Sequence, residues 1–146
     1  MVPLTITRHK KTKLDGSAKL LLYGYGSYGS SMSPSFSSTR ISLIERDIIW
    51  VTSHIRGGME KGMKWWKEGK LLNKKNTFED YIASAKFLIE KKFTSKGNII
   101  GMGGSAGGLL MGAVVNQAPD LFLGIVMAVP FVDSLTTNLD HSLPLT

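Results

Sequence analysis

Cysteine is absent from the 146 residues of this chain, which excludes a disulfide framework. Long apolar runs are absent as well, since no stretch reaches the roughly 18 apolar residues that a membrane-spanning helix needs. The first residues, MVPLTITRHKK, lack the apolar core of a signal peptide. With no signal and no disulfides, we expect a cytoplasmic protein without a membrane partner.

Acidic side chains are scarce: 11 Asp and Glu stand against 18 Lys and Arg, and the net charge is +7. Such a field could attract nucleic acid. Residues 60–75 even interleave Trp65 and Trp66 with lysines, as single-strand binders do. No recognised nucleic-acid-binding motif accompanies the charge, so we interpret the lysines as a solvated surface and do not expect a nucleic-acid partner.

Short apolar runs rich in Ile, Leu and Val recur along the chain with little alternation, which is typical of strands buried on both faces of a parallel sheet. A further run at residues 2–9 alternates more and suits an edge or antiparallel strand. The four continuous runs cover residues 19–26, 47–55, 98–104 and 124–130.

An amphipathic helix is predicted for residues 76–92, where Thr77 and Asp80 resemble a capping box at its start. Strands alternating with helices predict an α/β fold with a mostly parallel sheet and helices on both faces. The Gly/Ser/Tyr-rich loop 24–38 directly follows a predicted strand. Ligands gather at the carboxyl ends of strands in such sheets, so this loop is a candidate part of a site. The apolar face of the predicted helix comprises Phe78, Tyr81, Ile82, Ala85, Leu88 and Ile89.

Ser105 stands among glycines between a predicted strand and a predicted helix, which should end near Ala118 because Pro119 disfavours helix before it. Residues 103–107, GGSAG, fit the G-x-S-x-G nucleophile elbow. Glycines two before and two after the serine remove Cβ atoms that would clash in a sharp turn. Free N–H groups at the helix start favour an oxyanion. The pattern therefore predicts a nucleophile at Ser105.

Two other interpretations of the same glycines are a tight turn or phosphate-cradling loop without catalysis, and a dinucleotide-binding fingerprint over residues 101–106. A dinucleotide site also requires an acidic residue about 20 positions later at a strand end. Asp120 lies just after Pro119, in a turn, and does not meet this requirement. We therefore expect no cofactor.

Several longer segments are more specific than the elbow. They are LLLYGYGSYG (20–29), HIRGG (54–58), GKLLNKKNTFEDYI (69–82), GGSAGGLLMGAV (103–114), PDLF (119–122) and VPFVDSLTTNLD (129–140). In this order they resemble the catalytic domain of the prolyl oligopeptidase family of serine peptidases, and within it the bacterial oligopeptidase B (protease II) branch.

The resemblance implies an α/β-hydrolase fold and a reaction in which Ser105 forms an acyl-enzyme. It also implies an oxyanion hole made by the hydroxyl of Tyr25 and the backbone N–H of Ala106. The substrates implied are short peptides cut after Arg or Lys, with no cofactor and no metal.

A serine triad also needs a histidine and a carboxylate. Asp120 and Asp133 do not occupy the family's triad positions. His141 directly follows Asp140, so the two cannot come from separate strand ends, and we interpret His54 as structural.

The family's own acid and histidine, and its β-propeller, match nothing in residues 1–146. We therefore expect a partial α/β-hydrolase catalytic domain that lacks the propeller and the C-terminal part. Such a chain would be inactive alone unless a complementing C-terminal chain supplied the missing groups. With an apolar strand edge uncovered, it should also be poorly soluble by itself.

Two departures concern specificity and backbone strain. The branch's Asp-Pro-Asp is Ser33-Pro34-Ser35 here, so an attraction for basic side chains is lost. The third glycine of the family's RGGGE is Met59, which would be strained if that position requires a positive φ. The alternatives left open are an esterase or acyl-peptide hydrolase of the same fold, and a non-catalytic, nucleic-acid-binding remnant.

Overall fold

The computed structural model describes residues 1–143, and its elements alternate between strands and helices along the chain. The strands are β1 (Leu4–Thr7), β2 (Leu20–Tyr23), β3 (Ile49–Ser53), β4 (Ile99–Gly104) and β5 (Phe122–Ala128). The α-helices are α1 (Ser38–Ile44), α2 (Met63–Lys67), α3 (Lys75–Glu90), α4 (Ala106–Gln117) and α5 (Ser134–Leu139). Two short 3₁₀ helices are η1 (Leu71–Asn73) and η2 (Pro119–Leu121).

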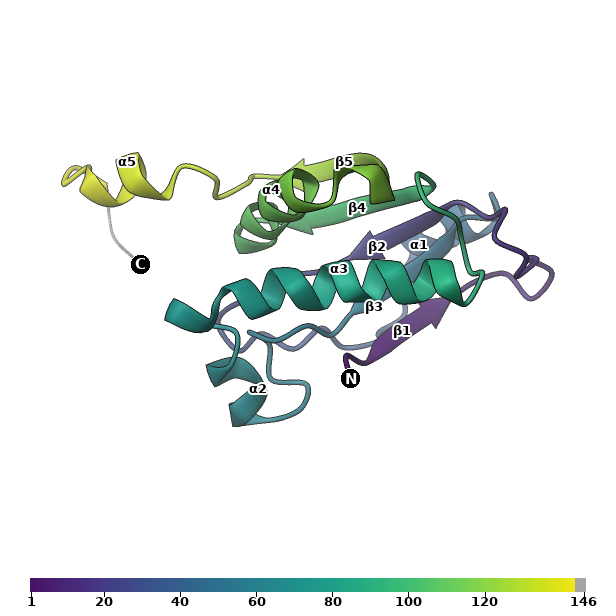
Figure 1. Ribbon diagram of the computed structural model, residues 1–146, viewed down its shortest axis with the longest axis horizontal. Coiled ribbons are helices and arrows are strands. Elements are labelled where there is room, and N and C mark those ends of the chain that lie inside the picture. Colours follow the sequence, from purple (N-terminus) through teal and green to yellow (C-terminus); the bar gives the residue numbers. More distant parts are fainter. Residues whose placement is uncertain (144–146) are drawn as a thin grey trace.

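The five strands form one sheet in the order β1-β3-β2-β4-β5. Strands β2 to β5 are parallel, and β1 runs antiparallel to β3 at one edge. Helix α1 lies behind the sheet in Figure 1, whereas α3 and α4 lie in front of it. The predicted fold class, a mostly parallel α/β sheet with helices on both faces, is confirmed, and the four parallel strands all end at the same edge.

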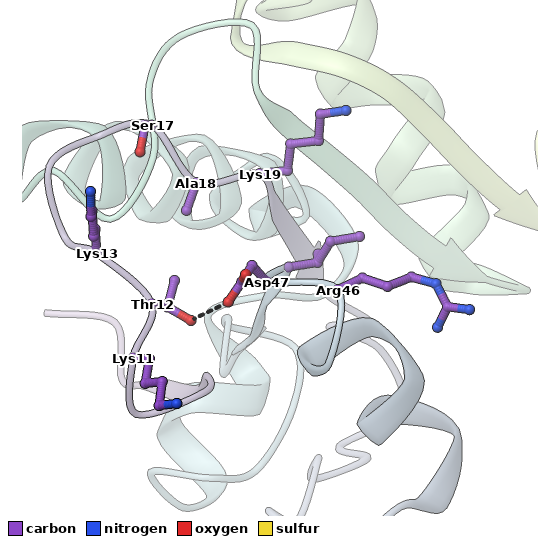
Figure 2. Close-up of a pocket in the computed structure, with 9 residues that line it drawn as sticks. Lys11, Thr12, Lys13, Ser17, Ala18, Lys19, Arg46 and Asp47 are labelled. Carbon is purple, nitrogen blue, oxygen red and sulfur yellow. Dashed lines mark hydrogen bonds between the residues drawn. The ribbon is translucent and has the colours of Figure 1, made fainter.

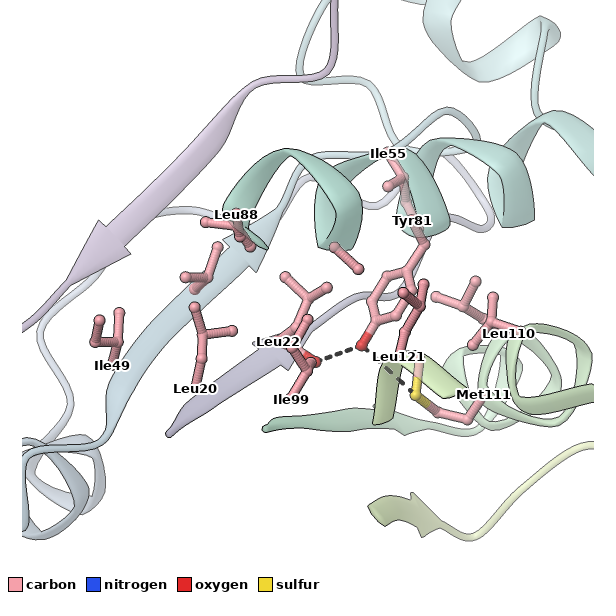
Figure 3. Close-up of a cluster of buried hydrophobic side chains, with 13 residues drawn as sticks. Leu20, Leu22, Ile49, Ile55, Tyr81, Leu88, Ile99, Leu110, Met111 and Leu121 are labelled. Carbon is pink, nitrogen blue, oxygen red and sulfur yellow. Dashed lines mark hydrogen bonds between the residues drawn. The ribbon is translucent and has the colours of Figure 1, made fainter. Parts of the chain in front are cut away.

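The core lies between the sheet and the front helices α3 and α4. Figure 3 shows Leu20, Ile49 and Ile99 of the sheet beside Tyr81 and Met111 of the two helices. All five are fully buried, and the Tyr81 hydroxyl donates to the carbonyl oxygen of Leu22 at 2.5 Å. This packing fixes both helices against the sheet and so fixes the points where they begin.

Strand β5 is much more exposed than the continuous apolar run 124–130 predicts. Leu123, Val126 and Met127 expose 53%, 44% and 43% of their surface. Within residues 1–143, β5 pairs with β4 alone, so the expectation of burial on both faces is wrong for this strand. No helix of the described residues is long and apolar enough to span a bilayer.

The predicted capping box at the start of α3 is wrong. Lys74 occupies the N-cap without a side-chain cap bond, and Thr77 lies inside the helix. The Thr77 hydroxyl donates to the carbonyl oxygen of Arg56 at 2.9 Å, and the Asp80 carboxylate binds the Arg56 guanidinium at 2.6 and 2.8 Å. The two side chains therefore attach a distant loop to the helix instead of capping it.

Met59 does not carry the strain that its glycine-rich context suggested, because its φ is not positive. The positive φ of this segment belongs to Gly57, at +99°. A Cβ added to Gly57 would lie 1.9 Å from the carbonyl oxygen of Gly26. Gly57 is therefore the position where only glycine fits, and methionine is tolerated two residues later.

Candidate active site

Ser105 lies at the junction of β4 and α4, where the chain reverses its direction. Its backbone has φ +53° and ψ −118°, and its side chain is exposed. A positive φ is uncommon for any residue with a Cβ and is found at strained functional positions. The sequence predicted an outward-facing hydroxyl on a sharp strand-to-helix turn, and the structure has that geometry.

Glycines around Ser105 are required for space rather than for backbone freedom. A Cβ added to Gly103 would lie 2.3 Å from the carbonyl oxygen of Gly107, and one added to Gly107 would lie 2.9 Å from that of Gly24. At Gly104 the nearest atom would be 3.4 Å away, an ordinary contact. The glycines two before and two after the serine thus allow the strand and the helix to meet so closely.

Backbone hydrogen bonds hold both the N–H and the carbonyl group of Ser105. Its N–H donates to the carbonyl oxygen of Ala128 at 2.9 Å, and its carbonyl oxygen accepts from the N–H of Phe131 at 3.0 Å. Ala106 is the first residue of α4, and no acceptor for its N–H occurs among the hydrogen bonds of residues 1–143. An amide donor at the positive end of a 12-residue helix therefore lies next to the serine.

Tyr25 lies in the loop that follows β2, with its side chain partly buried. Burial raises the pKa of Tyr25, and the neighbouring Tyr28 and Tyr23 raise it further. The Ser105 side chain lies close enough to the phenol to lower the pKa of Tyr25, but this effect is smaller than that of burial. The phenol is therefore protonated at neutral pH and can donate a hydrogen bond. The structure brings together the three residues that the sequence had singled out.

A partly buried lysine that the sequence reasoning missed binds the same loop. Lys74 Nζ donates to the carbonyl oxygen of Gly26 at 2.6 Å and lies 2.8 Å from the hydroxyl oxygen of Ser27. Burial lowers the pKa of Lys74 to about 8. One signal was available in the sequence, because two lysines directly precede the predicted helix, where positive charge opposes the helix dipole.

The candidate carboxylates bind partners other than Ser105. Asp120 pairs with Lys96 at 3.1 Å in η2, before β5 begins and hence at the opposite edge of the sheet. Asp133 caps α5, and Asp140 accepts from its own turn. No hydrogen bond in the described part of the chain joins any of the three to the serine.

The histidines are also bound elsewhere or exposed. His54 is buried, with Nε2 2.7 Å from the Thr5 hydroxyl oxygen and Nδ1 3.5 Å from the Glu60 carboxylate, in keeping with a structural role. His141 is exposed beyond α5. The structure therefore places no histidine of residues 1–143 in a hydrogen bond with Ser105.

The tryptophans of the lysine-rich segment are engaged within the chain. Lys61 Nζ lies 4.7 Å from the ring centre of Trp65, and Lys70 Nζ lies 3.6 Å from that of Trp66. The Trp65 indole N–H also donates to the carbonyl oxygen of His54. These rings are covered by the lysines of their own segment, which argues against their use as a stacking platform for bases.

A basic hollow of about 370 Å³ lies at the amino ends of β2 and β3, away from the edge that carries Ser105. In Figure 2, Lys11 and Lys13 lie on one side of it and Lys19 and Arg46 on the other, so the four cations do not converge. Asp47 adds a negative charge to the same wall. The hollow therefore offers no shared anion site.

Comparisons with known proteins agree with the geometry. A model of the Prolyl oligopeptidase family matches residues 34–146. Over 145 residues, 99% of the chain, it is 52% identical to Protease 2 of Moraxella lacunata and 49% identical to Dipeptidyl aminopeptidase BI of Pseudoxanthomonas mexicana. The structure of oligopeptidase B from Leishmania major superposes with a TM-score of 0.94 at 48% identity, also over 99% of the chain. The chain spans 20–21% of the length of these relatives.

Proposed function

The chain belongs to the prolyl oligopeptidase family, and on this premise we propose that it carries the nucleophile and the oxyanion hole of a serine peptidase. Ser105 is the nucleophile, and the hydroxyl of Tyr25 and the N–H of Ala106 form the oxyanion hole. One observation carries the proposal: a protonated phenol and an unpaired amide donor flank an exposed serine at a junction with φ +53°. This is the arrangement that acyl transfer needs.

In the proposed reaction, the Ser105 oxygen attacks a peptide carbonyl carbon and its proton passes to a general base. The carbonyl oxygen becomes an oxyanion and accepts hydrogen bonds from the Tyr25 hydroxyl and the Ala106 N–H. Collapse of this intermediate expels the amine, which takes up the proton, and leaves an acyl-enzyme. Water then hydrolyses the ester and restores the serine.

We propose that residues 1–146 do not complete this cycle alone and constitute part of a catalytic domain. The described residues place neither a histidine nor a carboxylate against Ser105. A complementing polypeptide that supplied both would also cover the exposed surface of β5. Leu123 and Val126 on that strand are about half exposed, which supports such a contact.

For the substrate, we propose short peptides with a basic residue before the cleaved bond, as the likeness to oligopeptidase B suggests. Ser33 and Ser35 carry no charge, but Glu60 lines a hollow of about 240 Å³ next to the same loop. A second candidate is release of dipeptides from peptide N-termini, supported by 49% identity to the relative named Dipeptidyl aminopeptidase BI.

The test is a hybrid in which this chain replaces the matching 145 residues of Moraxella lacunata Protease 2. We expect a fluorophosphonate probe to label the hybrid stoichiometrically at Ser105, and Ser105→Ala to abolish both labelling and hydrolysis. Removal of one oxyanion donor by Tyr25→Phe should lower kcat about 100-fold with little change in KM.

The chain alone should show no appreciable labelling. Strong labelling of the isolated chain at Ser105 would mean that a working base lies within it. A folded hybrid that is not labelled would overturn the nucleophile assignment. Reporter peptides that end in Arg or in Pro, compared with dipeptide reporters, separate the two substrate classes.

A further inference from the structure

We infer that Lys74 is a positioning residue, which holds the loop behind Tyr25 so that the phenol stays directed at the oxyanion. The inference rests on the proposed function, because it assigns Lys74 to the same site. Within residues 1–143, Lys74 makes no hydrogen bond to the serine or to the phenol. It acts on the two residues that directly follow Tyr25 in the chain.

The peptide before Tyr25 is fixed by the elbow itself. The N–H of Gly24 donates to the carbonyl oxygen of Met102 at 3.1 Å. The carbonyl oxygen of Gly24 lies so close to the elbow that a Cβ on Gly103 or Gly107 would come within about 3 Å of it, at 3.1 and 2.9 Å. Gly24 therefore connects the start of the loop rigidly to the strand that bears Ser105.

The peptide after Tyr25 is fixed by Lys74. Gly26 has φ +71°, and its carbonyl oxygen accepts from the ammonium at 2.6 Å. The same oxygen abuts Gly57, where a Cβ would come within 1.9 Å of it. The Ser27 hydroxyl oxygen, 2.8 Å from Nζ, gives the ammonium a second hydrogen-bond partner on the same loop. Tyr25 is thus held between two anchored peptides, and the anchor on its C-terminal side is a single charged side chain.

Lys74 occupies a position that is unfavourable for a lysine. It is partly buried, and burial lowers its pKa. It stands at the N-terminus of the 16-residue α3, where the helix dipole disfavours positive charge. No carboxylate among the described residues pairs with it. A side chain kept in place at such a cost in stability is expected to serve a function.

Among residues 1–143, Lys74 is the only charged side chain that hydrogen-bonds to Gly26 or Ser27, while Glu60 accepts further along the loop, from the N–H of Met32. Arg56 and Asp80 bind each other, and desolvation is the only cause that shifts the Lys74 pKa. The remaining groups are Tyr25 and Tyr28 on the loop and Lys70 and Lys75 beside Lys74 on its own segment.

Hydrogen exchange of the chain itself tests the anchoring, independently of catalysis. Lys74→Met keeps the apolar stem and removes the donors, and Lys75→Met is the matched control because Lys75 is exposed. We expect Lys74→Met to speed exchange of residues 24–30 about tenfold, as for a lost charge-assisted bond, with no change in β4. Equal exchange in the two variants would refute the anchoring.

The hybrid peptidase tests whether the anchoring serves Tyr25. Lys74→Met should lower kcat about 10–100-fold with KM within about twofold, the effect of a misplaced oxyanion donor. In a Tyr25→Phe background the same substitution should cost less than about threefold, because the group that it positions is already gone. If Lys74→Met lowered kcat by the same factor with and without the Tyr25 hydroxyl, Lys74 would have a general structural role and the inference would be overturned.

The pH profile gives a readout that a purely structural role would not move. A neutral amine donates weaker hydrogen bonds than an ammonium, so kcat should fall about threefold as pH rises through about 8. Lys74→Met should lack this step, and Lys75→Met should retain it. A step that persists in Lys74→Met would contradict the assignment. An inactive hybrid would instead refute the proposed function, while hydrogen exchange would still decide the anchoring.

Discussion

Ser105 has a backbone conformation, φ +53° and ψ −118°, that glycine adopts more easily than a residue with a Cβ. Strain of this kind costs on the order of 1–3 kcal/mol and persists only where the surroundings enforce it. Here hydrogen bonds to Ala128 and Phe131 enforce it from one side and the close packing of Gly103 on Gly107 from the other. The strained backbone at Ser105 therefore reduces the stability of the folded chain.

This strain can be measured by substitution. Ser105→Gly should raise the free energy of unfolding by about 1 kcal/mol relative to Ser105→Ala, because both remove the hydroxyl and only glycine relieves the backbone. Chemical denaturation of the two variants provides the comparison. Equal denaturation midpoints and equal slopes of unfolding free energy against denaturant concentration in the two variants would show that the turn is not strained.

Residue roles at this site differ in how far the sequence could predict them. The glycine spacing predicted Ser105 on physical grounds, whereas Tyr25 and Ala106 came from the family resemblance. The lysines before the predicted helix were a sequence signal, but the contacts of Lys74 could not be predicted, because its acceptors lie 47 and 48 residues away in sequence. Only the folded chain brings that ammonium to the loop.

Among the elements, α3 and the loop around Arg56 depend on one partly buried ion pair. The Asp80 side chain is 8% exposed and accepts from the guanidinium and from the Arg56 N–H. The bonds to Asp80 raise the pKa of Arg56, so the guanidinium stays charged at every accessible pH. Removing one partner would leave the other charge desolvated and without compensation.

Asp80→Asn should therefore lower the free energy of unfolding by about 3 kcal/mol. Asp120→Asn, which breaks the exposed pair with Lys96, should cost less than about 0.5 kcal/mol. Denaturant unfolding of both variants checks the difference. Similar losses in the two variants would mean that burial does not distinguish the pairs.

The elements themselves could be predicted well, because short Ile/Leu/Val runs and a 3.6-residue apolar period are local signals. Helix α4 ends at Gln117, directly before Ala118, as Pro119 required. The capping box failed because Thr77 and Asp80 bind a loop some 20 residues away, and local spacing does not record such partners. The exposure of β5 was missed because an apolar run in the sequence shows only that the side chains are apolar. It does not show which other elements pack against them.

At the scale of the whole molecule, exposed apolar side chains gather towards the C-terminal side. In Figure 1, α5 extends away from the sheet, at the far end of the segment that follows β5. Val129, Leu135 and Leu139 there are 82%, 74% and 65% exposed. Together with the one-sided pairing of β5, this is the kind of surface that binds another polypeptide or aggregates.

The isolated chain should therefore self-associate at micromolar concentration. Leu123→Lys and Val126→Lys, which place charge on β5, should shift the population towards monomer. Ile41→Lys on α1, at a site of similar size and exposure elsewhere, should not. Sedimentation velocity measures the distribution, and a monodisperse unsubstituted chain with a cooperative melt would contradict this prediction.

The hydrogen bonds of Ser105 to residues that follow it in sequence have a consequence for biosynthesis. During translation the elbow cannot close when Ser105 leaves the ribosome, because its amide and carbonyl partners, Ala128 and Phe131, lie further along the chain and emerge later. The 26 residues that follow Ser105, up to Phe131, must emerge before both bonds can hold the serine. If Ser105 is the nucleophile that we propose, it cannot act on the growing polypeptide while its own strand is emerging.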